Sequence, residues 1–577
     1  MHNKQFIISK RVVEDRNFKY INLQNGYVLS FHKELNVVIA GDSILMGHAF
    51  QGDSSRDIPE KELLTMISPI ETYNTWNGRW ILFHKNEIHP DACAQMGIFY
   101  GKIEDELIVS TSLALIADMY NGEYKMNEYM PLEYNLLLSW VPGPYTVIDG
   151  INRLLPTQYL KVGKDFEVCF RNPISKTDYS LLSPQEIYKK IFNLQECTFR
   201  YIEKYDFKKC EYTDCKKNVF NIGLTAGYDS RMQAALMKKM GLNFKAHTFE
   251  RRKSTEQADI KYPRIIAEIL NIDWEYIPIN KRQAKRVIEY NAHTFDSVKD
   301  SDWKWLYTCG QYDKVDGNIL VRSSIWEAFC DYYVPFGSTA SLEDTAQVKY
   351  EDLKRIFETL DGNQTAEMSF KKYIEWVDKY PIEGLSWADR ITFEQLMGIW
   401  DGNENQGKDL FSRDIFMFHP GNSMEIFALI LALPKEKRMN RLWEKEIANM
   451  FIPELKSIPY NAPSKDANIN YYFPFKEELH EKNVILYGAG MVGKSYYMQI
   501  TTQQKCNVVA WVDKDYKKMR EVGIKVDSTE MIAELEFDYL IIAVESVDLY
   551  QIILNDLIDK GVERDKILWK ETRTIYG

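Results

Sequence analysis

The chain has 577 residues, which predicts about three domains, and its 45% apolar and 27% charged residues are typical of globular proteins rather than disordered or fibrous ones. A formal net charge of -11 argues against a nucleic-acid partner, because binding to phosphates needs a basic surface. The longest apolar run, at 426–434, is far shorter than the roughly 18 residues that a membrane span needs.

The N-terminal segment and the cysteines favour a cytoplasmic protein. Charged residues interrupt "MHNKQFIISKRVV", where a secretory signal would carry its apolar stretch. The eight cysteines are scattered without a CxxC pair, which is typical of reduced thiols and gives no zinc-binding spacing.

The first 180 residues are predicted to be rich in β-strands. Short alternating runs such as "GRWILFHK" (78–85) and "DELIVSTS" (105–112) are separated by Gly, Asn and Pro. A capping box then begins at Ser183, with Pro184 in the first helical turn and Glu186 at the third helical position. We therefore expect a helix from this point and domains over 1–180 and 183–465.

The stretch from about 215 to 280 alternates between apolar strands and helices. Its strands are "NVFNIGL", "FKAHTF" and "WEYIPI", and amphipathic segments lie between them. Continuous apolar strands that alternate with helices predict a parallel sheet covered on both faces. Helical patterning continues from 341 to 455, and a polar stretch at 457–474 indicates a linker or an active-site loop.

The turn "LTAGYDS" (224–230) follows the first of these strands and opens directly into a helix. Such a turn points backbone N–H groups and the positive end of the helix dipole at one place, which favours an anion. The turn also fits a plain strand-to-helix corner, and both interpretations stay open. If phosphates bind here, the binding residues are Thr225, Ala226, Gly227, Asp229 and Ser230.

The last hundred residues start a new βαβ pattern, which predicts a small Rossmann-like domain over 481–577. Gly488, Gly490 and Gly493 follow a strand and open a helix, and Asp513 comes twenty residues after the last glycine. This context favours a dinucleotide, with the carboxylate on the ribose. Because only about half of a full Rossmann domain remains, we expect a nucleotide or nucleotide-sugar ligand here, or a structural role that joins copies of the chain into a homo-oligomer, and NAD is a further alternative.

The turn and its surroundings resemble the asparagine synthetase family, whose PP-loop domain is an N-type ATP pyrophosphatase. "LTAGYDS" is similar to that family's pyrophosphate loop, and "HTFERRKSTEQADIKYPRIIAEIL" is similar to its next strand and helix, with Thr248 and Phe249 in register. The resemblance runs patchily from about 70 to about 465. It implies a multidomain α/β protein in which ATP binds to the central parallel-sheet domain.

The same resemblance implies that residues 1–180 form an α+β sandwich of the Ntn-hydrolase type. Glutamine-hydrolysing members use an N-terminal cysteine as nucleophile. Here position 2 is His2 and the first cysteine is Cys93. We therefore expect a glutaminase-like domain without glutaminase activity.

A second family motif is altered in "VRSSIWEAFCDYY" (321–333). Trp326 stands where the family has a metal-binding aspartate, and tryptophan cannot ligate Mg²⁺. Asp229 and Glu327 are therefore the predicted Mg²⁺ ligands, and Arg322 is a fixed cation that offsets phosphate charge. Asp331 is an alternative ligand in the same loop.

The resemblance implies an ATP-dependent carbon–nitrogen ligase that adenylates a small carboxylate, releases pyrophosphate and transfers ammonia or an amine. Predicted catalytic residues are Asp229, Arg322, Glu327 and Lys465, and further candidates are Arg390 and Arg413, whereas His419 is interpreted as a packed loop residue rather than a base. The C-terminal module resembles GAGxxG modules attached to bacterial sugar-modifying enzymes, which suggests a sugar acceptor in surface-polysaccharide synthesis. An inactive nucleotide-binding scaffold and a dinucleotide-dependent C-terminal enzyme are the alternatives.

Overall fold

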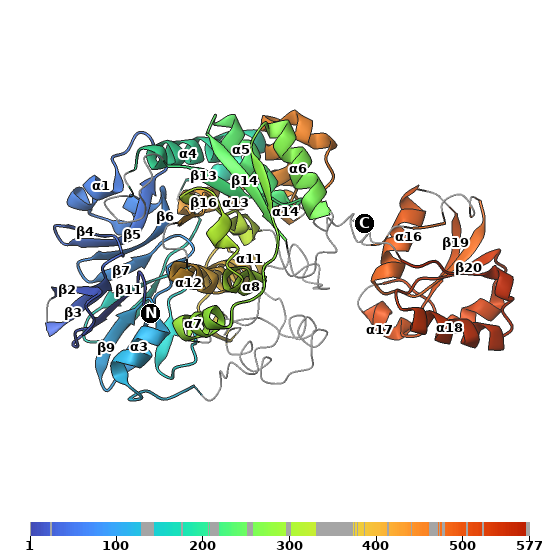
Figure 1. Ribbon diagram of the computed structural model, residues 1–577, viewed down its shortest axis with the longest axis horizontal. Coiled ribbons are helices and arrows are strands. Elements are labelled where there is room, and N and C mark those ends of the chain that lie inside the picture. The colour runs from blue at the N-terminus through green and yellow to red at the C-terminus, as the bar shows by residue number, and fades with distance from the viewer. Residues whose placement is uncertain are drawn as a thin grey trace. The chain divides into compact units, whose positions relative to one another are not determined.

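The described residues of the computed structural model form a mixed α/β fold with two antiparallel and two parallel sheets (Figure 1). The structure describes residues 2–23, 26–127, 143–174, 177–205, 207, 218–250, 258–295, 302–329, 373, 375–377, 379–385, 387–411, 415–439, 441–460, 471, 473–475, 479, 481–503, 506–521 and 524–572. Contacts divide the chain into two units. The first comprises 1–252 and 263–458, and the second comprises 253–262 and 459–577.

Two six-stranded antiparallel sheets form the N-terminal part of the first unit. In spatial order, one contains β10 (Ile151–Arg153), β8 (Phe99–Ile103), β9 (Glu106–Ser110), β1 (Phe6–Ser9), β3 (Val28–His32) and β2 (Phe18–Asn22). The other contains β12 (Phe166–Phe170), β11 (Gln158–Val162), β7 (Glu87–Pro90), β6 (Trp76–His84), β5 (Ser43–Gln51) and β4 (Val37–Ala40). The short helices here are α1 (Pro59–Thr65), α2 (Pro69–Tyr73) and α3 (Leu113–Tyr120).

The two antiparallel sheets pack face to face. Phe6 and Leu29 of the first sheet share one buried cluster with Met46, Ile81 and Leu160 of the second. Side chains alternate between the two faces of a strand, so the apolar alternation read from the sequence fills this interior.

Helix α4 (Pro184–Lys204) begins where the capping box predicted it. The Ser183 hydroxyl accepts from the Glu186 N–H, and the Glu186 carboxylate accepts from the Ser183 N–H at 2.8 Å. Ile191 and Phe199 of this helix belong to one buried cluster with Phe50 of the antiparallel sheet. The same cluster extends into the parallel sheet, so the parts before and after residue 180 share a core.

The second sheet system of the first unit is five-stranded and parallel, as the alternation of strands and helices predicted. In spatial order it contains β15 (Trp274–Ile277), β14 (Phe244–Phe249), β13 (Phe220–Gly223), β16 (Ile319–Val321) and β17 (Phe416–Phe418). Alternate residues face opposite sides. Ile319 and Val321 join the cluster that contains α5, whereas Leu320 and Met417 pack with Tyr307 of α8. Both faces are therefore covered.

Helices around the parallel sheet complete the first unit (Figure 1). They are α5 (Tyr228–Lys239), α6 (Ala258–Leu270, of which the residues from 263 belong to this unit), α7 (Ala284–Thr294), α8 (Asp302–Thr308), α11 (Trp387–Ile391), the π-helix η8 (Thr392–Asp401), α12 (Gly402–Phe411), α13 (Met424–Leu431), α14 (Lys435–Met439) and α15 (Leu442–Phe451). Single 3₁₀ turns are η3 (Tyr179–Leu181), η5 (Tyr312–Lys314), η6 (Ser324–Phe329) and η9 (Pro453–Ser457).

The second unit contains a four-stranded parallel sheet in the order β19 (Asn507–Val512), β18 (Asn483–Tyr487), β20 (Tyr539–Ile542) and β21 (Ile567–Leu568). Its helices are α16 (Met491–Gln503), α17 (Tyr516–Glu521), α18 (Val547–Asp559) and the 3₁₀ turns η10 (Thr529–Glu534) and η11 (Arg564–Lys566). Among the described residues of the whole chain, none of the helices combines the length and apolarity required to cross a bilayer.

Candidate functional site

The carboxyl edge of the parallel sheet of the first unit gathers the segments that follow three neighbouring strands. The turn beginning at Thr225 follows β13, Arg322 follows β16 and His419 follows β17. Because these strands are parallel and adjacent, the three segments leave the sheet at the same edge. In open α/β sheets, this edge is where ligands bind.

The turn between β13 and α5 is held by its own hydroxyl groups. The Ser230 hydroxyl accepts from the Thr225 N–H at 3.0 Å, and the two hydroxyl oxygens lie 3.0 Å apart. The Thr225 hydroxyl accepts from the Gly227 N–H at 3.1 Å. Gly227 is the N-cap of α5 and makes no side-chain cap hydrogen bond, so the first turn of this helix presents its dipole without a side-chain cap.

Three carboxylates surround the guanidinium of Arg441 beside this turn. Asp229 accepts a hydrogen bond from Nη2, and Glu327 accepts from Nη1 at 3.4 Å. Glu444 accepts from Nε at 2.9 Å and from Nη2 at 3.0 Å. The guanidinium also lies 5.3 Å from the centre of the Tyr228 ring. We call this group the Arg441 cluster.

Burial disfavours ionisation throughout the Arg441 cluster. It raises the pKa of Asp229 well above the ordinary value, although the Arg441 charge acts in the opposite direction. Burial and then the Asp229 charge raise the pKa of Glu327 to about 7. Burial also raises the pKa of Glu444. One guanidinium therefore only partly compensates three crowded acids.

These observations bear on the ligands that the sequence suggested. The uncapped first turn of α5 suits phosphate oxygens, and a Cβ at Gly227 would meet only the Thr225 hydroxyl, at 3.1 Å. The metal site that the resemblance implies has no comparable support in the structure. Asp229 and Glu327 share Arg441, and no set of three His, Cys, Asp or Glu side chains suited to a metal occurs among the described residues.

Trp326 and Arg322 are close to Glu327 in sequence, but their side chains make other contacts. Trp326 is buried, donates to the Gln233 side-chain oxygen at 3.1 Å and packs edge-on against Trp443. It is a core residue that joins η6 to α5 and α15. Arg322 donates to the Tyr312 hydroxyl at 3.1 Å. The cation that contacts Asp229 in the structure is thus Arg441.

The next predicted positions lie at the end of β14. The buried Thr248 hydroxyl donates to the Leu224 carbonyl at 2.7 Å and accepts from the Trp274 indole at 2.9 Å. Phe249 packs edge-on against Tyr312, with ring centres 4.8 Å apart. Both residues brace the strands that carry the turn.

A second buried polar group lies on the segments that follow β16 and β17. His419 is 3.9 Å from Asp401, and Lys408 donates to Asn405 at 3.1 Å. Burial and then the Arg322 charge lower the pKa of Lys408 to about 7, and burial lowers the pKa of His419 to about 3. Asp401 is the last residue of the π-helix, and Lys408 lies in the last turn of α12, the helix that follows directly.

The remaining predicted residues of the first 470 positions are Arg390, Ala226 and three residues that cannot be placed. Arg390 forms a buried ion pair with Glu394 at 3.0 Å, within one helical turn. Ala226 is fully buried in the turn. Lys465, Arg413 and Asp331 lie outside the described residues.

The glycine-rich turn of the second unit has the backbone that its sequence predicted. Gly488 adopts a φ of +105°, and a Cβ at Gly493 would lie 1.9 Å from the Gly488 carbonyl oxygen, so both positions require glycine. Asp513 accepts from the Ala489 N–H at 2.6 Å and from the Asp515 N–H at 2.7 Å. Its carboxylate therefore braces the turn, although an ionised carboxylate can accept further bonds.

Arg441 and Glu444 were missed by the sequence reasoning. Their spacing of three residues at the start of a helix is a detectable signal for a local ion pair. Their other partners, Asp229 and Glu327, lie 212 and 114 residues away in the chain. No local pattern links residues that far apart.

Comparison with known proteins gives limited matches. The family model described as C2185-like, N-terminal, matches residues 480–568. No curated protein matches the chain. One similar solved structure is NMN synthetase from Francisella tularensis, which has 16% identity. The match covers 38% of this chain and 93% of that chain, and the TM-score is 0.17.

Two other solved structures are also similar to parts of this chain. The NH3-dependent NAD synthetase from Campylobacter jejuni has 13% identity, covers 38% of this chain and 95% of that chain, and gives a TM-score of 0.18. The glutamine phosphoribosylpyrophosphate amidotransferase from B. subtilis has 8% identity. The match covers 57% of this chain and 71% of that chain, with a TM-score of 0.16. Scores this low carry no argument about this chain.

Proposed function

We propose that this chain is an ATP-dependent ligase that activates a carboxylate as an acyl-adenylate. A substrate carboxylate oxygen attacks the α-phosphorus of ATP, and pyrophosphate leaves. A nitrogen nucleophile then attacks the acyl carbon, loses a proton, and AMP leaves with the bonding electron pair. The observation that carries the proposal is the turn at 225–230, which lies at the carboxyl end of the central strand and opens into a helix without a side-chain cap.

The residues of the turn would act by position and charge. Backbone N–H groups at the start of α5 would hold the departing pyrophosphate, and Gly227 would let the phosphates approach closely. Phosphoryl and adenylyl transfer need little covalent help from the protein, so alignment of the two reactants supplies much of the rate. Thr225 and Ser230 keep the turn in shape through their mutual hydrogen bonds.

Asp229 and Glu327 remain the proposed protein ligands for Mg²⁺, which would neutralise phosphate charge. In the structure both carboxylates contact Arg441, so a magnesium ion that arrives with ATP would have to exchange with this guanidinium. Arg441, rather than Arg322, is then the cation available to the phosphates. Lys465 stays a proposed pyrophosphate ligand on the resemblance alone.

The nitrogen source is proposed to be something other than glutamine hydrolysed by this chain. Cys93, the first cysteine, is fully buried, and burial raises the pKa of its thiol well above the ordinary value. A thiol in that state is a poor nucleophile. Free ammonia, ammonia from a partner, or an amine on the substrate itself would serve, and a sugar acid of a surface polysaccharide is the proposed acceptor.

The second unit is proposed to bind NAD or a nucleotide-sugar at Gly488, Gly490, Gly493 and Asp513. The glycines support this role because Gly488, with a φ of +105°, and Gly493, with no room for a Cβ beside the Gly488 carbonyl, form the tight strand-to-helix turn that such ligands require. If this unit carried the activity, the chain would be a dinucleotide-dependent enzyme.

An inactive nucleotide-binding scaffold is the second candidate for the first unit. Two observations favour it: Arg441 already contacts Asp229 and Glu327, and Trp326 is buried in the core where the resembled family has a metal ligand. A scaffold would bind ATP without turnover.

The test is pyrophosphate release from ATP in the presence of Mg²⁺ and candidate carboxylates, including aspartate, uronic acids and nucleotide-linked sugar acids. The Asp229→Ala variant is expected to lose the release. Asp273→Ala is the matched control, because Asp273 is exposed and precedes β15 at the opposite edge of the same sheet. Tight ATP binding without release would support the scaffold, and glutamate formation from glutamine would contradict the assigned nitrogen source.

A further inference from the structure

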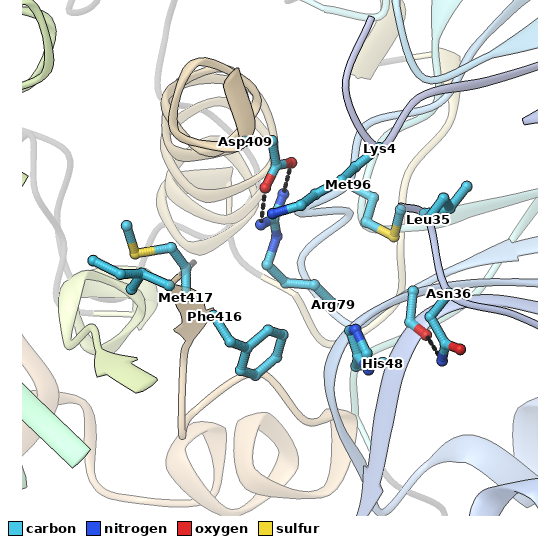
Figure 2. Close-up of a pocket in the computed structure, with 11 residues that line it drawn as sticks. Lys4, Leu35, Asn36, His48, Arg79, Met96, Asp409, Phe416 and Met417 are labelled. Carbon is cyan, nitrogen blue, oxygen red and sulfur yellow. Dashed lines mark hydrogen bonds and ion pairs between the residues drawn. The ribbon is translucent and has the colours of Figure 1, made fainter. Parts of the chain in front are cut away.

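Two groups of charged residues in the first unit differ in how a guanidinium is matched by acids. Arg79 and Asp409 lie beside a small cavity that Lys4 also lines (Figure 2). Their contact is two-pronged, with Nη1–Oδ1 and Nη2–Oδ2 distances of 3.0 and 2.8 Å. A planar guanidinium and a planar carboxylate that meet along both prongs match each other in charge and shape. In the Arg441 cluster, by contrast, three carboxyl groups contact one guanidinium.

The two edges of the Arg441 guanidinium are held differently. Glu444 accepts from Nε at 2.9 Å and from Nη2 at 3.0 Å, so it binds one edge with both of its oxygens. The other edge is divided between Asp229, which accepts from Nη2, and Glu327, which accepts from Nη1 at 3.4 Å. Glu444 is therefore the anchor of Arg441, and the second edge of the guanidinium is shared by two partners.

Arg441 also occupies a place that is unusual for a cation. It is the N-cap of α15, and its guanidinium contacts Asp229 in the first turn of α5, so it lies at the positive ends of two helix dipoles. Neither helix has a side-chain hydrogen bond at its N-cap. The φ of Arg441 is +54°, which is unfavourable for a residue with a Cβ. Without the three acids, this place would attract an anion.

The shared edge is the one that a ligand can reach. The side chains of Asp229 and Glu327 are 17% and 29% exposed, whereas Glu444 is fully buried. Asp229 also lies in the turn that contains Gly227, where phosphates are proposed to bind. A guanidinium edge matches two phosphate oxygens as well as it matches carboxylate oxygens. Asp229 and Glu327 therefore cover the part of Arg441 that is best suited to phosphate.

We propose that Asp229 and Glu327 compete with phosphate for Arg441, so that the Arg441 cluster is the self-inhibited form of a polyphosphate site. A polyphosphate at the turn that begins at Thr225 would take over the shared edge of the guanidinium, while Glu444 keeps the other edge in place. The inference rests on the proposed function, which places phosphates at this turn. It adds that the protein's own carboxyl groups set the affinity for phosphates.

Calorimetric titration of the full chain with inorganic pyrophosphate in the presence of EDTA tests this competition without a metal ion. Asp229→Ala removes one competitor and is expected to bind pyrophosphate roughly tenfold more tightly than the parent chain, which is the change that one hydrogen bond to a charged group produces. Asp273→Ala removes an exposed aspartate from the opposite edge of the same sheet and should bind like the parent chain. If Asp229 acted only as a metal ligand, Asp229→Ala would leave metal-free binding unchanged.

Variants of Arg441 and Glu444 separate competition from a general change in charge. The double variant Asp229→Ala, Arg441→Met is expected to bind no more tightly than Arg441→Met alone, because the competitor acts through the guanidinium. Equal tightening in both backgrounds would overturn the proposal. Should Arg441→Met not fold, Glu444→Gln in the Asp229→Ala chain decides. It removes a further negative charge but also the anchor, so pyrophosphate binding is expected to weaken, and further tightening would overturn the proposal.

Titration of the same chains with ATP and Mg²⁺ distinguishes a failure of this inference from a failure of the proposed function. If the parent chain binds ATP but Asp229→Ala binds pyrophosphate no more tightly than the parent chain does, the competition is wrong and the proposed function stands. If none of the chains binds either ligand, the proposed function fails and the inference fails with it. ATP binding by the parent chain, together with a tightening in Asp229→Ala that depends on Arg441, supports both.

Discussion

Replacement of Glu327 by glutamine is expected to make the first unit more stable at high pH and to leave it unchanged at low pH. In the folded chain, burial and the Asp229 charge raise the pKa of Glu327 to about 7, against an ordinary value of 4.5. Between pH 4.5 and pH 7, Glu327 is therefore mostly protonated in the folded chain and mostly ionised in the unfolded chain. Stability of the parent chain must fall as pH rises through this window, because ionisation is easier in the unfolded state.

The size of the effect follows from the shift. A difference of 2.5 pKa units corresponds to at most about 3.4 kcal/mol. Because 29% of the Glu327 side chain is exposed, solvent reduces the observed value below this bound. For a unit of roughly 450 residues the unfolding entropy is about 0.9 kcal/mol/K, so the Tm difference is at most about 4 °C.

The assay is differential scanning calorimetry of the parent chain and Glu327→Gln between pH 4.5 and pH 8. Tm values are expected to coincide at the acid end and to diverge as pH rises, with the variant more stable. Glu454→Gln, at an exposed glutamate, should show no divergence. A constant difference across the range, or a variant that is less stable at pH 8, would mean that Glu327 is ionised and stabilised by Arg441, and would refute the reasoning.

Three further predictions concern stability. Ser183→Ala removes the capping box of α4 and should cost about 1 kcal/mol, which lowers Tm of the first unit by about 1 °C. Gly493→Ala puts a Cβ 1.9 Å from a backbone carbonyl oxygen and should lower the melting temperature of the second unit sharply, whereas Gly490→Ala, with nothing within 4 Å, should melt like the parent chain. Trp326→Phe leaves a cavity and an unpartnered Gln233 oxygen, so calorimetry should show a loss of about 2–3 kcal/mol; an unchanged Tm would contradict its place in the core.

The regular elements could be predicted wherever their signals are local. The capping box at Ser183 and the strands at 218–224, 244–249 and 274–279 depend on residues within a few positions of one another, and the structure has a helix and three parallel strands there. The glycine spacing at 488–493 likewise encodes its own turn. Local sterics and periodicity are sufficient for such features.

The candidate site could be predicted only in part, because its contacts are not local. The sequence predicted the turn at 225–230 and Arg322 as a cation for the phosphates, but it gave no sign of Arg441, whose guanidinium contacts Asp229. Residue spacing along a strand end does not determine which way a long side chain turns. The cavity at Lys4 and Asp409 is likewise formed by segments more than 300 residues apart.

The central claim is that the turn at 225–230 binds the phosphates of a nucleotide, and calorimetric titration of ATP with Mg²⁺ tests it most directly. Gly227→Leu is the decisive variant. Its φ of -72° is open to any residue, but its Cβ would lie 3.1 Å from the Thr225 hydroxyl that holds the turn, so the larger side chain would disturb the turn at the start of α5. We predict that the parent chain and Asp273→Ala bind ATP and that Gly227→Leu, although it still folds, does not. Equal ATP binding by Gly227→Leu, or no binding by the parent chain, would contradict the account.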